Sequence, residues 1–137
     1  MKKIAFLLIL ISTAYSVTAQ NISGVINDYA QVTGINLNVI TLNNAANFNI
    51  GDRILIVKMK GATIDQTNTN TYGDTLSMND AGRYLFSNII AKTANDVTLD
   101  TFCNIFDTIQ HIQMVRVPIY SNPTVTATLT CTPWNGT

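Results

Sequence analysis

The chain has 137 residues, of which 47% are hydrophobic and only 12% are charged, and its eight lysines and arginines balance eight aspartates. This length suits one domain, and the charge balance excludes a strongly basic nucleic-acid-binding surface. The abundant Asp, Asn and Thr favour turns and strand faces, whereas Glu, which covers exposed helices, is absent. The composition therefore predicts an all-β fold, either a small sandwich or a partly open barrel.

Residues 1–19 have the pattern of a signal peptide, expected to be helical before cleavage. Lys2 and Lys3 precede an apolar run at residues 4–11, and Ala19 is the small residue expected at the cut. The run is shorter than the roughly 20 apolar residues that span a bilayer, which favours cleavage over anchoring. We expect a secreted or cell-surface chain without a stable membrane span, consisting of a single β-rich domain at residues 20–137. Its six cations and eight aspartates give a net charge of about −2.

Strand patterns recur at short intervals between Asn, Gly, Asp and Thr clusters, as in a sandwich or barrel and unlike alternating βα units. The predicted strands are residues 39–42, 53–60, 82–92, 97–99, 109–120 and 124–132. The strand at 53–60 is apolar on both faces, so we expect it to be central. Gly51-Asp52 predicts the turn before it, and Asn95-Asp96 a later hairpin turn.

The core is predicted to include several aromatic side chains and one face of the last strand. The aromatic residues are Tyr84, Phe86, Phe102 and Phe106. The strand at residues 124–132 alternates without interruption, which predicts that Val125, Ala127, Leu129 and Cys131 face inward and the threonines outward. We also expect this strand to be an edge that continues into further β-structure.

Residues 61–81 form a polar segment that is longer than ordinary connections and is expected to be exposed. Three aspartates and three asparagines in it carry the oxygen ligands that calcium prefers, namely Asp65, Asp74, Asp80, Asn68, Asn70 and Asn79. Their spacing matches no ordered calcium loop, which favours simple solvation of the loop. A saccharide site would use exposed aromatic rings beside polar groups, for which Tyr72 with Asp65 and Asp74, and separately Tyr120 and Trp134, are the candidates.

Cys103 and Cys131 are the only two cysteines, and an oxidising compartment favours a disulfide between them. Two buried thiols are the alternative, because both cysteines lie near apolar residues and the decisive geometry is not visible in the sequence. His111 is the only histidine, which excludes multi-histidine zinc sites. No catalytic motif is found, and no cofactor is predicted.

The sequence of residues 48–62, the Gly82-Arg83-Tyr84 triplet, residues 115–120 and residues 133–137 together resemble one family. It is the amino-terminal module of large secreted surface proteins of Bacteroidetes-type bacteria, similar to type IX secretion cargo and adhesin-like proteins. The resemblance covers about residues 25–137 and implies that the domain opens a longer protein. It implies a structural or adhesive role and no catalytic residue.

We therefore expect a non-enzymatic, adhesin-like or structural module at the cell surface. The alternative is a carbohydrate-binding or carbohydrate-active accessory domain. The partner, an extracellular glycan or a protein, is left open by these residues.

Overall fold

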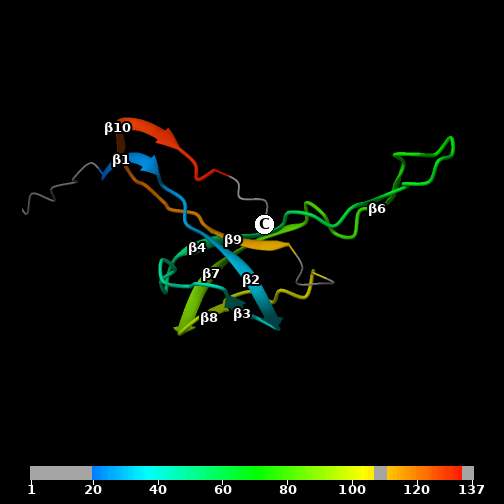
Figure 1. The fold of residues 1–137 in the computed structure, drawn as a ribbon. Helices are drawn as coiled ribbons and strands as arrows, with labels where there is room; N and C mark the ends of the chain where they lie inside the picture. Colours follow the sequence, from blue (N-terminus) through cyan, green and yellow to red (C-terminus); the bar gives the residue numbers. More distant parts are fainter. Residues whose placement is uncertain (1–19, 107–110, 134–137) are drawn as a thin grey trace, which may run out of the picture.

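The computed structural model describes residues 20–106 and 111–133, and this part of the chain contains strands and turns but no helix. Its strands are β1 (Gln20–Val25), β2 (Tyr29–Asn36), β3 (Val39–Leu42), β4 (Arg53–Lys58), β5 (Thr63–Ile64), β6 (Thr75–Ser77), β7 (Tyr84–Thr93), β8 (Asp96–Leu99), β9 (Ile112–Arg116) and β10 (Pro123–Thr130). About half of the described residues lie in these strands, so the predicted all-β fold is confirmed (Figure 1). Within the same residues, no helix has the length and apolar character needed to cross a membrane.

Six strands close into an antiparallel barrel in the order β2-β3-β8-β7-β4-β9. The ring closes because β9 pairs with β4 on one side and with β2 on the other. The barrel is thus closed, where the sequence suggested a sandwich or a partly open barrel. The predicted central strand is β4, which is hydrogen-bonded to β7 and β9, as expected.

The barrel interior is filled by aliphatic side chains from every strand. The buried residues include Ala30, Val32, Ile40, Leu42, Ile54, Ile56, Ile89, Val97, Leu99, Ile112 and Met114. They alternate with outward-facing neighbours, and each large aliphatic side chain contributes roughly 1.5–3 kcal/mol on burial. A small barrel of this kind is a packed core, so binding chemistry is to be sought on its outside.

The aromatic side chains of β7 lie outside the barrel, contrary to prediction. Tyr84 and Phe86 are 62% and 44% exposed, because it is the other face of the strand, with Ile89, that points inward. Phe102 is exposed as well, and only Phe106 packs against the core as expected.

Two predicted turns can be compared with the structure. Gly51 adopts a positive φ of 91°, and the backbone N–H of Asn49 donates to Asp52 Oδ2 over 2.7 Å, which forms the expected turn before β4. The β7–β8 hairpin turn uses Ala94 and Asn95, one residue earlier than predicted, because Asp96 already belongs to β8. Ala94 takes the positive φ of 50° that this tight turn requires.

Strand β9 is shorter than the predicted strand at residues 109–120. His111 precedes it with a φ of 58°, a left-handed conformation that does not continue a strand, and the imidazole is exposed. The ladder ends at Arg116, before Pro118. Residues 109 and 110 of the predicted strand lie outside the described residues.

Residues 61–81 leave the barrel as a long excursion that carries the β5–β6 pair (Figure 1). Among the strands of the described residues, these two contact each other and no other. Tyr72 at the tip is 70% exposed, and Leu76 and Met78 are exposed too, which confirms the expected exposure. At the base, Asn79 Nδ2 donates to the Gly61 carbonyl over 2.9 Å, and a Cβ on Gly61 would lie only 2.8 Å from the Asn79 carbonyl oxygen. This close approach requires glycine.

The last strand, β10, pairs in parallel with β1, and no other strand of residues 20–106 or 111–133 lies along its second edge, as expected of an edge strand. All of its residues are exposed, including Val125 and Leu129. The predicted buried face is therefore wrong, because no further layer of the described chain covers this two-stranded sheet. Cys131 is exposed for the same reason, and Trp134 lies outside the described residues.

Candidate functional site

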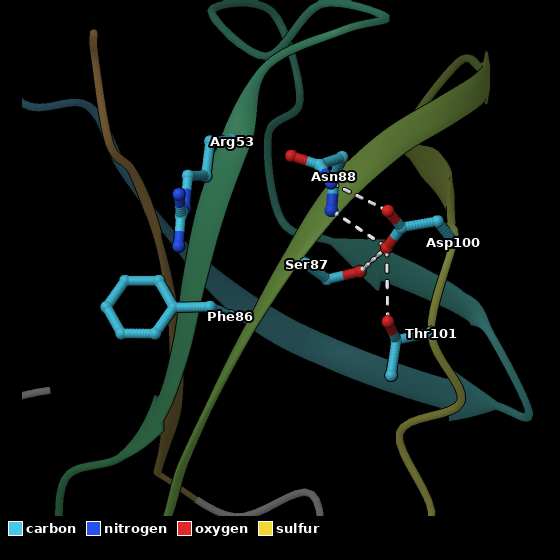
Figure 2. A pocket seen from close by; sticks show the side chains of 6 residues that line it. All are labelled: Arg53, Phe86, Ser87, Asn88, Asp100 and Thr101. Atoms are coloured by element: carbon cyan, nitrogen blue, oxygen red, sulfur yellow. Dashed lines mark hydrogen bonds between the residues drawn. The ribbon is translucent and has the colours of Figure 1, made fainter.

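A shallow hollow of about 240 Å³ lies on the outside of the barrel, against β4 and β7 (Figure 2). It is lined by Arg53, Phe86, Ser87, Asn88, Asp100 and Thr101. The first comes from β4, the next three from β7, and the last two from the segment that follows β8. Pockets for drug-sized ligands hold about 300–1,000 Å³, so this hollow suits one small ring or polar group.

Asp100 is the centre of the hydrogen bonding in the hollow. Its Oδ1 accepts bonds from Ser87 Oγ at 2.6 Å, the Asn88 backbone N–H at 3.0 Å and Thr101 Oγ1 at 3.1 Å. Its Oδ2 accepts a bond from Asn88 Nδ2 at 2.7 Å. The bond from Ser87, followed by the two from Asn88, holds the pKa of Asp100 well below its usual range. The group is therefore an ionised hydrogen-bond acceptor at any physiological pH.

The side-chain amide of Asn88 is oriented by this carboxylate. Because Nδ2 donates to Asp100, the carbonyl Oδ1 of the amide points away from Asp100, toward the side of the hollow where Arg53 lies (Figure 2). The hollow thereby presents an amide acceptor between an anion and a cation.

Arg53 is held against an aromatic pair on β7. Its guanidinium carbon lies 5.2 Å from the centroid of the Phe86 ring, which is cation–π geometry. Phe86 in turn meets Tyr84 edge to face, with ring centroids 6.0 Å apart and an interplanar angle of 80°. Arg53 forms no ion pair with any residue in 20–106 or 111–133. Its charge is positioned but lacks an acidic partner in this part of the chain.

The structure places three of the four predicted binding residues together on the excursion, on a different element from the hollow. The backbone N–H of Asp65 donates to the Asp74 carbonyl over 2.8 Å, and Tyr72 lies in the turn between them. The Asp65 carboxylate accepts bonds from Thr67 and Thr71, which lower its pKa, Thr67 contributing most. Trp134, the fourth residue, is outside the described part of the chain.

The aspartates suggested for calcium do not share a site. Asp80 pairs with Arg83 at 2.9 Å, and Asp65 is engaged by threonines. Among the described residues, no group of three or more His, Cys, Asp or Glu side chains is arranged to hold a metal ion. Asn79, also among the suggested ligands, uses its amide Nδ2 to bind the Gly61 carbonyl.

The two cysteines are free, so the suggested disulfide is not formed. Cys103 lies in the barrel core, where burial raises the pKa of its thiol to about 11. Cys131 is exposed beyond β10. The alternative of two buried thiols therefore holds for Cys103 alone.

The sequence did not point to Arg53, Asn88 or Asp100, and it assigned Phe86 to the core. One signal was present, since Tyr84, Phe86 and Asn88 share one face of an alternating strand while Leu85, Ser87 and Ile89 share the other. The second set consists of the aliphatic Leu85 and Ile89 and the small Ser87, which a narrow barrel accommodates.

Comparison with protein-family models and with curated proteins finds no match for this chain. Among solved structures, the chain is similar to the tailspike of Acinetobacter baumannii bacteriophage AP22, which was solved in complex with A. baumannii capsular saccharide. The sequence identity is 12% and the TM-score 0.42, and the likeness covers 75% of this chain but 16% of the tailspike. A likeness this low carries no argument about function.

Proposed function

We propose that this protein is a non-catalytic extracellular module that binds a saccharide on the outer face of β4 and β7. The observation that carries the proposal is the exposed Tyr84–Phe86 pair beside the polar groups of Asn88 and Asp100. Aromatic rings and polar acceptors occur there on one rigid surface.

Sugars have two kinds of surface that such a site can recognise. Their C–H faces pack on aromatic rings, and their hydroxyl groups donate to carboxylate and amide oxygens. Phe86 lines the hollow together with Asn88 and Asp100, whose Oδ1 and Oδ2 serve the second contact, and Tyr84 beside Phe86 extends the aromatic surface for the first. Strand β7 carries the rings and Asn88, and the hydrogen bonds from Ser87 and Asn88 hold Asp100 in place before the ligand arrives, which reduces the entropy lost on binding.

Recognition is favoured over hydrolysis by the chemistry of Asp100. Most glycosidases use two carboxyl groups, one of which is protonated and acts as the general acid. Among the described residues, Asp100 is the one carboxyl group that lines the hollow, and its lowered pKa leaves it without a proton to donate. The arrangement suits an acceptor that orients a hydroxyl group.

The extracellular setting is part of the proposal and is supported by the signal-like residues 1–19. A saccharide-binding face would also suit the adhesin-like surface proteins that the sequence resembles. We place the domain, on those grounds, at the start of a longer surface protein.

The test is a screen of the purified secreted chain against immobilised glycans, followed by affinity measurements on three variants. Tyr84→Ala and Phe86→Ala each remove an aromatic contact and should weaken binding about tenfold, equivalent to about 1.4 kcal/mol. Tyr72→Ala is the matched control, because it removes a similarly exposed tyrosine, 70% against 62% for Tyr84, from the excursion. Loss of binding in Tyr72→Ala alone would show that the site lies on the excursion. The absence of any bound glycan would contradict the proposal.

A further inference from the structure

We infer that the saccharide is acidic, and that the carboxylate of a uronic-acid residue pairs with Arg53 while its hydroxyl groups reach Asn88 and Asp100. This inference rests on the proposed function and specifies the class of sugar. Two features of one hollow carry it: Arg53 is held in place and makes no ion pair among residues 20–106 and 111–133, and the Asn88 amide is oriented by its hydrogen bond to Asp100.

Two properties of Arg53 favour the binding of an anion. The Phe86 ring restrains the guanidinium, so less side-chain entropy is lost when a ligand binds. The guanidinium also makes no ion pair within the described residues, whereas Arg83 pairs with Asp80 and Arg116 pairs with Asp28. A planar guanidinium matches a carboxylate through two parallel hydrogen bonds, which are stronger than bonds to a neutral hydroxyl.

The side of the hollow opposite Arg53 disfavours a small anion that has no hydroxyl groups. Asp100 is ionised there, and it would repel a small anion that offered no hydrogen-bond donor. The Asn88 amide lies between the two charges, with Nδ2 directed to Asp100 and Oδ1 to the side of Arg53 (Figure 2). A uronic acid has a carboxylate at one end and hydroxyl donors at the other, which matches this order of cation, amide and anion.

The size of the hollow agrees with one sugar residue. At about 240 Å³ it is too small for an oligosaccharide, so neighbouring sugars of a chain would lie across the outer face toward Tyr84. A neutral sugar would fit the same volume but would leave the guanidinium with water as its partner. We therefore expect the site to distinguish acidic from neutral sugars by charge and not by size.

The experiment measures affinity for a panel of galacturonate, glucuronate and mannuronate oligosaccharides and for their methyl esters, which keep the shape and remove the charge. The wild type should prefer at least one acid over its ester by about tenfold, the ratio expected for about 1.4 kcal/mol. Arg53→Gln should abolish the preference and Arg53→Lys should keep part of it, because lysine retains the charge without the planar fork. Arg83→Gln, which removes the same charge elsewhere, should leave the preference intact, and thermal melting should show that each variant is folded.

Equal affinity for acids and esters, or a preference that survives in Arg53→Gln, would overturn the inference and leave the proposed function standing. The same holds if the chain binds neutral glycans in the screen but no member of the acidic panel. If it binds no saccharide of either kind, the proposed function fails, and this inference fails with it.

Discussion

Ser87 Oγ donates a 2.6 Å hydrogen bond to Asp100 Oδ1, and this contact fastens the segment after β8 to β7. Ser87 is buried on the inner face of its strand, whereas Asp100 is exposed at the hollow. The bond therefore connects the packed barrel to the proposed binding surface, and the orientation of Asn88 depends on the same carboxylate.

The Asp100 network should make stability depend on pH. The pKa of Asp100 is lower in the folded chain than in the unfolded chain, where it is about 3.9. The stabilisation that the carboxylate gives to the fold is therefore complete well above pH 3.9 and is lost as the pH falls toward the folded pKa. We expect the melting temperature to fall on acidification from about pH 5, and to fall less steeply in Asp100→Asn. Calorimetric melting of both proteins across this range measures the difference, and parallel pH profiles would contradict it.

The two faces of β4 should respond differently to truncation. Ile54 is fully buried in the barrel, so Ile54→Ala should lower the free energy of unfolding by about 2–5 kcal/mol. Leu55 is half-buried on the outer face, and Leu55→Ala should cost about 1 kcal/mol. Urea denaturation gives both values, and equal losses would show that the assignment of the two faces is wrong.

The excursion should be dispensable for the barrel. Of the described strands, β5 and β6 contact only each other, and the hydrogen bond from Asn79 to Gly61 keeps the two ends of the excursion together. Replacing residues 62–78 with a short Gly-Ser linker should therefore leave the melting temperature and saccharide affinity nearly unchanged. Unfolding of this variant would show that the excursion supports the barrel, and loss of affinity alone would show that it contributes to the site.

The β1–β10 sheet should exchange its amide hydrogens faster than the barrel. Two strands with exposed faces are marginally stable in water, whereas the barrel strands surround a shared core. Hydrogen–deuterium exchange should show low protection for Gln20–Val25 and Pro123–Thr130 and high protection for β4 and β8. Equal protection would indicate that another surface covers this sheet.

The periodicity of the sequence predicted the all-β class, the central position of β4 and the exposure of residues 61–81. These features depend on local composition, because strand alternation and turn residues act over a few neighbours. The alternation of a strand does not indicate which of its two faces points into the barrel. Strand β7 has large apolar residues on both faces, and the six-stranded ring takes up Leu85 and Ile89 and leaves Tyr84 and Phe86 outside.

The hollow and the exposure of β10 were missed because both depend on pairings between distant segments. Arg53 lies opposite Asn88 only in the β4–β7 register, and Asp100 reaches Asn88 only after the β7–β8 hairpin has formed. Likewise, β10 has an uninterrupted amphipathic pattern, but its pairing with β1 leaves both of its faces uncovered.

Backbone-amide NMR during titration with a saccharide from the screen tests most directly whether the outer face of β4 and β7 binds sugar. We expect the shift changes to concentrate at Arg53, residues 84–88 and residues 100–101, and to need about tenfold more saccharide in Tyr84→Ala and Phe86→Ala. Shift changes concentrated at residues 63–77, or along the β1–β10 sheet, would contradict the proposed site.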